Sequence, residues 1–407
     1  MTYFLSFILF LLPVYQIRFN LGFLPINLLD ILIIIVFLWW LGRSIYMRNA
    51  KIPPVKILLP IVIFTAAAII GIFVAPDTRV ALGQLKSWIV LPILFGLVLF
   101  DRLQRGDFKA KLNLLYTGLI AAGLLVGLHA IWQKISGQVA LDGRVLGIYG
   151  LFPKENASPN FLALYLAPLA VLALGIAMPA AGWKKWFYFS GAIIMIGAIY
   201  FSGSRGGILA VLAGLLAIIF YLLQRKFTQS AKLVKIAAAI VVVLALFFLW
   251  QVAKPDFSAH SGRVASSNNT RWEIWQSSWQ VIKSHPIFGI GLGNFQNYFI
   301  ANFQDKPGYQ LYIIDKAYSP HNLYLALYLN LGLLGLAAFL WLLYLFFQSR
   351  KEVFLRPAIC AMVAILAYGL VDTPYFKNDL SVLFWALFFM VIAWQNFKKM
   401  NPSASSG

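Results

Sequence analysis

The chain has 407 residues, of which 61% are hydrophobic and only 11% are charged. This composition excludes an ordinary soluble protein, because charged residues make up about a quarter of a typical soluble domain. The formal net charge of +20 would suit a nucleic-acid-binding protein, but the basic residues are divided among short segments between apolar runs. We therefore expect an integral membrane protein that has no nucleic-acid partner.

Long apolar runs recur along the chain, and most approach the roughly 20 residues that a helix needs to span a bilayer. We predict an all-α integral membrane protein, a polytopic bundle of about twelve transmembrane helices. The first run lacks a basic segment and a small-residue cleavage site, which favours a retained span over a signal peptide. The predicted spans are residues 3–17, 24–42, 57–75, 87–100, 112–133, 158–178, 186–202, 207–223, 233–250, 322–347, 357–372 and 379–396.

Lysine and arginine are concentrated in alternate short loops, as is typical of the cytoplasmic side of a membrane protein. These basic segments are residues 43–56, 102–111, 184–185, 225–235, 350–356 and 398–399. The pattern predicts that both termini are cytoplasmic in a single polytopic domain, 1–407. It also predicts a large extracytoplasmic loop, 251–320, before the tenth span, and a disordered tail, 401–407.

Metal and cofactor chemistry has little support in the sequence. Cys360 is the only cysteine and falls within a predicted span, and the four histidines show no metal-ligand spacing. We expect no cofactor and no metal site.

Two polar segments interrupt the middle of the chain. Arg144 and Lys154 lie in the loop before the sixth span, which begins near Asn160. This loop is either a solvated turn or one wall of a polar site. Farther along, Ser204-Arg205-Gly206-Gly207 joins the seventh and eighth spans with hardly any loop between them.

An arginine at that depth usually faces a water-filled cavity. Glycines such as Gly206 let backbone amides approach a ligand, and the start of a helix attracts anions. We interpret the segment at Arg205 as an anion cradle; the alternative is an arginine that reaches back to the membrane surface.

The loop 251–320 contains at least one helix. A capping box from Thr270 to Glu273 predicts its start, with Arg271 in the first turn, where an anionic partner would be favoured. Tryptophans at helical spacing predict an apolar stripe in the headgroup layer; the stripe comprises Trp272, Trp275, Trp279 and Ile282. The glycines that follow resemble a nucleotide loop only superficially, since no βαβ context surrounds them.

The same loop ends at His321, just before a long apolar helix. Ser319 is a good N-cap and Pro320 suits the first helical position, so we predict His321 in the first turn, followed by Asn322. This would fix a titratable imidazole where membrane meets water. The plainer alternative is a polar residue that merely ends a loop.

Three motifs, in this order, resemble the O-antigen ligase and O-antigen polymerase superfamily of bacterial polytopic glycosyltransferases. They are Ser204-Arg205-Gly206-Gly207 before a span; Arg271 with a Trp-rich helix and a His-Pro-x-x-Gly-x-Gly-x-Gly-Asn run; and Pro320-His321-Asn322 with Asn330 and Gly332. The resemblance covers residues 144–336. It departs at Asn330, where many members carry glutamate.

The resemblance implies a donor glycan on undecaprenyl diphosphate and a location in the bacterial cytoplasmic (inner) membrane, among membrane lipids. It also implies that Arg205 and Arg271 bind the diphosphate and that His321 activates the acceptor, a lipid A-core sugar or a growing glycan. The residues that we expect to line the site are Arg144, Lys154, Asn160, Ser204, Gly206 and Asn322.

The chemistry of these side chains fits that assignment. Guanidinium groups stabilise a leaving diphosphate, and imidazole is the side chain whose ordinary pKa suits a base near neutral pH. We predict a metal-independent, inverting transfer resembling O-antigen ligation.

Alternatives of two kinds remain open at this point. An O-antigen or exopolysaccharide polymerase, or a protein O-oligosaccharyltransferase, would differ only in the acceptor. A lipid-glycan flippase or secondary transporter would share the many spans. The scarcity of acidic residues within the spans disfavours a transporter, since Asp30 and Asp372 lie near span ends.

Overall fold

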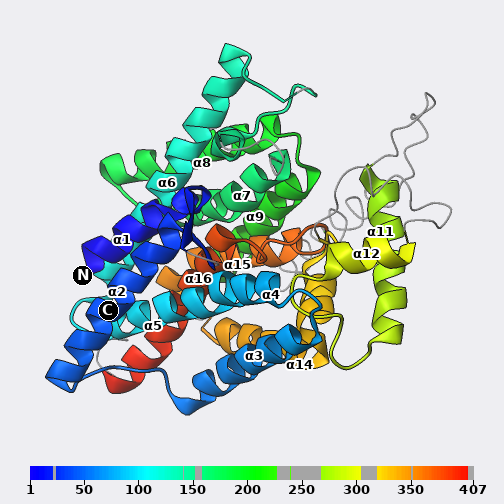
Figure 1. The fold of residues 1–407 in the computed structure, drawn as a ribbon. Coiled ribbons are helices and arrows are strands. Elements are labelled where there is room, and N and C mark those ends of the chain that lie inside the picture. Colours follow the sequence, from blue (N-terminus) through cyan, green and yellow to red (C-terminus); the bar gives the residue numbers. More distant parts are fainter. Residues whose placement is uncertain are drawn as a thin grey trace.

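The computed structural model describes residues 1–21, 24–140, 142–151, 158–226, 239, 267–303, 319–349 and 352–401. Helices dominate this part of the chain, which confirms the predicted all-α class (Figure 1). The N-terminal elements are α1 (Thr2–Phe10), the 3₁₀ helix η1 (Leu12–Gln16), β1 (Arg18–Leu21), β2 (Leu24–Asn27), α2 (Leu28–Met47), α3 (Val55–Val74), α4 (Thr78–Gln84), the π-helix η2 (Leu85–Val90), α5 (Leu91–Leu103) and α6 (Phe108–Ser136). The remaining elements are η3 (Gly147–Gly150), α7 (Pro159–Ala177), α8 (Gly182–Phe201), α9 (Arg205–Lys226), α11 (Ser267–Ser284), α12 (Phe295–Phe303), α14 (Leu323–Phe347), η5 (Val353–Leu355), α15 (Arg356–Tyr368) and α16 (Asn378–Met400).

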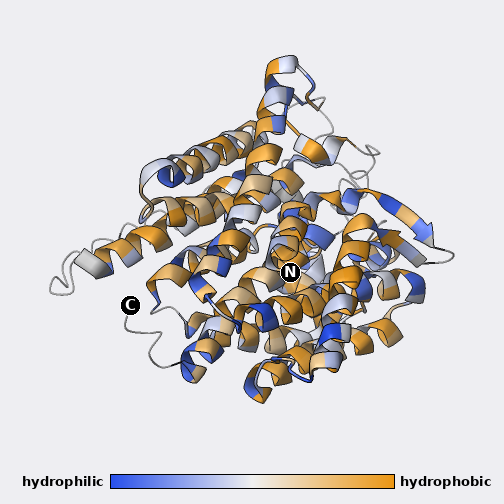
Figure 2. Ribbon diagram, turned by 90° about the vertical axis from the view of Figure 1, so that its left-hand side faces the viewer, coloured by the Kyte–Doolittle hydropathy of each residue, from blue (hydrophilic) through white to orange (hydrophobic). Residues whose placement is uncertain are grey.

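Eight of the described helical segments are long and apolar enough to cross a membrane. Apolar residues cover most of their surface, and hydrophilic residues gather at helix ends and in loops (Figure 2). The segments are Leu28–Met47, Val55–Val74, Thr78–Leu103, Phe108–Ser136, Pro159–Ala177, Arg205–Gln224, Leu323–Phe347 and Asn378–Met400. The chain is therefore a multi-pass membrane protein.

Two predicted spans are shorter than expected. The run 3–17 is not one helix, because α1 ends at Phe10 and the chain continues as η1 around Pro13. Proline lacks an amide hydrogen and disfavours helix at the residue before it. An antiparallel hairpin that the sequence did not suggest follows, with Arg18 opposite Asn27.

The other shortened span is 357–372, which ends as α15 at Tyr368 and continues as a turn. Of the remaining predicted spans, 186–202 corresponds to α8, whereas 233–250, apart from residue 239, lies outside the described residues.

The helix α16 lies at the centre of the bundle, and α7 is nearly as buried. In the most apolar stretch of α16, 83% of the residues are buried, compared with 33% in α2 and α9. Its residues are apolar on every side, the pattern of a helix enclosed by others. Trp385 packs edge-on against Phe384 and Phe388, whose rings stack on Phe339 and Phe346 of α14.

Four of the basic segments, 43–56, 102–111, 350–356 and 398–399, meet at one end of the bundle. The Arg105 guanidinium donates to the backbone carbonyl of Asn49 at 2.5 Å, and Lys398 forms an ion pair with Glu352 at 2.8 Å. The opposite end holds the N-termini of α14 and α16, and α11 and α12 lie far from α1 and α2 (Figure 1). The charge asymmetry seen in the sequence therefore corresponds to two distinct ends of the structure.

The helix α14 is broken at Gly332, whose φ of 67° and ψ of −170° are not helical. The segment between α11 and α12 fills the break. Leu333 N–H donates to Ile287 O at 3.0 Å, and Ile290 N–H donates to Leu329 O at 2.9 Å. These bonds satisfy backbone groups that the break would leave without partners.

The three glycines of this segment allow the close packing. A Cβ on Gly289 would lie 2.5 Å from Leu329 O, and one on Gly291 would lie 2.5 Å from Ala75 N. Both residues have positive φ, which glycine adopts without strain. The glycine run therefore joins α3 and α14, which explains it without a nucleotide.

Candidate functional site

The turn 369–373, between α15 and α16, is where several helix ends meet. Leu323 N–H donates to Gly369 O at 2.7 Å, and the Asn322 side-chain amide donates to Leu370 O at 3.0 Å. The first residues of α14 thus satisfy carbonyl groups at the C-terminal end of α15, which have no partner within that helix.

The start of α14 differs from the prediction. Asn322, not Ser319, is the N-cap, and its side-chain oxygen accepts from the amides of Tyr324 and Leu325 at 3.0 and 3.1 Å. Asparagine caps at least as well as serine, and the Ser319 hydroxyl instead accepts from the Thr373 hydroxyl at 3.4 Å. His321 therefore precedes the helix, with a φ of +46° in the left-handed region.

His321 faces Asp372 across this turn. The imidazole Nδ1 lies 3.3 Å from Asp372 Oδ1, which also accepts from Thr373 N–H at 2.9 Å. The Asp372 side chain is 6% exposed and the His321 side chain 31%. The carboxylate is buried, whereas the imidazole reaches the surface of the site.

The charge of Asp372 determines which of the two side chains donates the hydrogen bond between them. Burial alone would raise the pKa of the Asp372 carboxyl, but the His321 imidazole and the Arg271 guanidinium together hold this pKa below its ordinary value. An ionised carboxylate only accepts hydrogen bonds, so His321 Nδ1 must carry the proton. In the neutral imidazole Nε2 is then the basic ring nitrogen.

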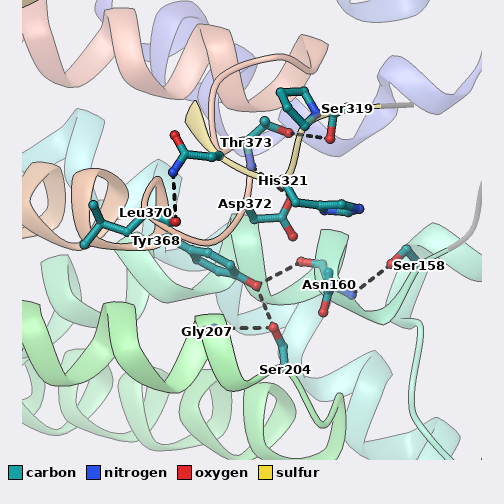
Figure 3. Close-up of polar contacts among 12 residues, drawn as sticks. Ser158, Asn160, Ser204, Gly207, Ser319, His321, Tyr368, Leu370, Asp372 and Thr373 are labelled. Atoms are coloured by element: carbon teal, nitrogen blue, oxygen red, sulfur yellow. Dashed lines mark hydrogen bonds and ion pairs between the residues drawn. The ribbon is translucent and has the colours of Figure 1, made fainter. Parts of the chain in front are cut away.

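A second polar cluster lies beside this pair. The Tyr368 hydroxyl is 2.6 Å from the Ser204 hydroxyl and donates to Asn160 O at 3.5 Å. Figure 3 shows the His321 ring and the Asp372 carboxylate facing the same space as Asn160 and the Tyr368 hydroxyl. Segments far apart in the sequence therefore meet at one site.

Ser204 and its neighbours begin α9. The Ser204 hydroxyl accepts from Gly207 N–H at 3.3 Å, and Arg205, the first residue of the helix, is exposed. A Cβ on Gly206 would lie 2.5 Å from the Tyr368 ring, and one on Gly207 would lie 2.8 Å from Ala163. Close helix packing accounts for both glycines without a ligand.

The helix that carries Arg271 also differs from the prediction. α11 begins at Ser267, so Arg271 lies in its second turn rather than its first. No glycine or proline lies between Ser267 and Thr270, so nothing stops the helix from extending back. Arg271 is still close enough for its charge to lower the pKa of the Asp372 carboxyl.

The predicted tryptophan stripe of α11 divides between two faces. Trp272 and Trp279 are exposed, whereas Ile282 is buried and Trp275 is half-buried. The indole N–H of Trp275 donates to Pro320 O at 3.1 Å. Trp275 therefore turns toward the segment before α14 because it finds a hydrogen-bond acceptor there.

The remaining predicted lining residues have other roles or lie outside the structure. Arg144 pairs with Asp142 at 2.5 Å, and its aliphatic stem lies near Gly203, one residue before Ser204. Asn322 uses its side chain as a cap. Lys154 lies outside the described residues.

Sequence reasoning missed Asp372 and Tyr368. No motif marks either, and Asp372 was recognised only as an acidic residue near a span end. Its one signal was an ionisable residue at a membrane boundary, which is costly unless it has a partner.

The N-termini of α7, α9 and α14 meet around the turn 369–373, and the positive ends of helix dipoles stabilise anions. Arg205 is the first residue of α9, next to Ser204, and Arg271 lies on α11. Among the described residues, no group of three or more His, Cys, Asp or Glu could hold a metal ion.

The chain is similar to known proteins. Residues 190–340 match the family model described as O-antigen ligase. The chain is also similar to the teichuronic acid biosynthesis protein TuaE of Bacillus subtilis (strain 168), with 26% identity over 227 residues. This match covers 50% of the chain and 44% of the relative, so the chain spans less than half the relative's length. Residues 190–340 thus carry the O-antigen ligase domain, which confirms the resemblance over that segment.

Proposed function

We propose that this chain is a glycosyltransferase that moves a glycan from undecaprenyl diphosphate to an acceptor hydroxyl. The observation that carries the proposal is the pair formed by His321 and Asp372, beside the N-termini of three apolar helices. This geometry supplies a base and an anion-binding surface at the end of a membrane bundle. The matched O-antigen ligase domain contains both His321 and the two arginines.

In the proposed reaction, the acceptor hydroxyl attacks the anomeric carbon of the donor glycan. Nε2 of His321 takes the hydroxyl proton as the new carbon–oxygen bond forms. The bond from the anomeric carbon to the diphosphate breaks, and the diphosphate leaves with the electron pair. Attack from the side opposite the diphosphate inverts the anomeric configuration.

Asp372 supports this step in two ways. Its carboxylate orients the imidazole by accepting from Nδ1–H, and its charge stabilises the imidazolium that forms. A buried acid performs both functions in other histidine bases. The low exposure of Asp372 strengthens the interaction, because little water screens it.

Arg205 and Arg271 take the proposed role of diphosphate ligands. Planar guanidinium groups donate pairs of hydrogen bonds to phosphate oxygens and stabilise the charge that develops on the leaving group. The amides at the N-terminus of α9 add further donors. Transfer is proposed to need no metal.

The orientation in the membrane is part of the proposal. The basic loops that meet near Arg105 and Lys398 would face the cytoplasm, together with both termini. The site and the loop 251–320 would then lie on the outer face of the cytoplasmic membrane, in one polytopic domain.

The acceptor is proposed to be a lipid A-core sugar, as in ligation. A polymerase would use the end of a growing glycan, and the name of the B. subtilis relative agrees with polysaccharide assembly in general. An assay of the purified protein with undecaprenyl-diphosphate glycan and each acceptor tests the proposal. Product should form with one acceptor, persist in EDTA and show the inverted anomer. Absence of transfer to every acceptor, with the donor merely moved across vesicle membranes, would instead support a flippase.

A further inference from the structure

Trp275 lies where α11 meets the segment that precedes α14. Its indole N–H donates to Pro320 O at 3.1 Å and lies 3.4 Å from His321 O. One side-chain donor thus contacts the backbone carbonyl groups of both Pro320 and His321. The indole is half-buried, beside the cluster of Ile274 and Leu329.

The backbone held in this way is strained. His321 has a φ of +46°, in the left-handed region that residues other than glycine rarely adopt. Such a conformation persists only where its surroundings enforce it. Asn322, the residue after His321, is anchored to the end of α15 by its hydrogen bond to Leu370 O. Pro320, the residue before His321, is held by the hydrogen bond from Trp275 on α11.

We propose that Trp275 is a positioning residue for His321, since its indole N–H keeps the imidazole directed at Asp372. This inference rests on the proposed function, in which His321 is the base. Trp275 does not contact substrate in this role. It acts through the backbone of Pro320 and His321.

The placement of Trp275 on α11 adds a second consequence. Arg271 lies four residues earlier, on the same side of the helix and one turn away. A single rigid helix therefore carries the proposed diphosphate ligand and the residue that positions the base. The distance between the leaving group and the base is then fixed by the geometry of one helix.

Two variants at Trp275 test the proposal. Trp275→Phe removes the N–H donor, and incorporation of benzothienylalanine at this position replaces the N–H by sulfur while keeping the shape. Both should lower kcat by on the order of 10–10²-fold, the cost of a small misplacement of a catalytic group. The donor KM and the affinity for undecaprenyl diphosphate should not change, because the arginines remain.

Trp279→Phe is the matched control, since it makes the same change on the exposed face of α11. It should leave kcat and KM as they are. A wild-type kcat in the benzothienylalanine protein would overturn the inference, as would a loss of donor affinity equal to the loss of kcat.

His321→Ala, measured alongside, separates this inference from the proposed function. Normal turnover in His321→Ala would refute the function itself. An inactive His321→Ala together with a fully active Trp275→Phe would refute only the positioning role.

Discussion

The side-chain oxygen of Asn330 accepts a hydrogen bond from the backbone amide of Gly293 at 2.8 Å, and its side-chain nitrogen donates to Ala326 O at 2.7 Å. Asn330 is 7% exposed and lies two residues before the break in α14. It therefore fastens the glycine run to the broken helix by donating one hydrogen bond and accepting another. This structural role accounts for an amide at position 330.

Asn330→Asp is expected to destabilise the protein. The substitution keeps the shape but replaces the donor to Ala326 O by a carboxylate oxygen in a buried place. The loss should be about 1–3 kcal/mol, seen as a lower midpoint of thermal unfolding. Asn302→Asp removes a similar contact, to Tyr298 O, at an exposed site and serves as the control. Equal effects of the two substitutions would contradict the proposed fastening role.

The orientation in the membrane is tested by labelling of single cysteines. The buried native Cys360 would first be replaced by alanine so that it cannot contribute signal. An impermeant thiol reagent should then label Gln280→Cys from the outer side of the membrane, and Lys184→Cys only after the cytoplasmic face is opened. Both positions are exposed in the structure. Labelling of both from the same side would refute the topology and the placement of the site.

The proposed role of Arg205 predicts a strong effect of even a conservative change. Arg205→Lys keeps the charge but loses the planar pair of donors, so most activity should be lost. Arg205→Ala should lose ~2–4 kcal/mol of transition-state stabilisation, measured from kcat/KM at equal amounts of folded protein. Arg43→Lys, at an exposed position near the other end of the bundle, should have no effect. Wild-type turnover in Arg205→Ala would favour an arginine that only reaches the membrane surface.

The sequence was sufficient for the features that depend on neighbouring residues. Apolar runs predicted most of the long helices, and the sequence placed His321 next to the start of a long apolar helix. The start of α14 was placed too early because Ser319 and Asn322 are both good caps. Only the contacts of each side chain show that Ser319 interacts with Thr373.

Contacts between distant segments were beyond the reach of local patterns. Asp372 follows α15 and belongs to no sequence motif that includes His321. The two residues come together only because the start of α14 packs against the end of α15. In the same way, the helical spacing of Trp275 suggested a membrane-facing residue, whereas tertiary packing gives it an acceptor at Pro320. The glycines near Arg205 suggested ligand binding, although packing against Tyr368 accounts for Gly206.

The charge of Asp372 also predicts a pH dependence of stability. Its pKa in the folded state lies below its ordinary value, so its ionised form stabilises the fold. This contribution is fully present above the unfolded-state pKa of about 4 and is lost as the pH falls through the folded value. Thermal midpoints of the wild type and Asp372→Asn, measured from pH 6 downward, should therefore converge only below about pH 4. A constant difference across that range would contradict the assignment.

Asp372→Asn should also impair catalysis. An asparagine amide can donate to Nδ1, which would move the imidazole proton to Nε2 and remove the base. We expect kcat to fall by about 10²–10⁴-fold with little change in affinity for undecaprenyl diphosphate. A substitution that weakened donor binding but left kcat unchanged would place Asp372 in the diphosphate site instead.

His321 itself gives the last test. His321→Ala should reduce kcat by ~10²–10⁴-fold while donor binding persists through the arginines. His321→Gln separates the roles that remain. Substantial activity in His321→Gln would reduce His321 to a hydrogen-bond donor, whereas lower stability with unchanged specific activity would make it purely structural.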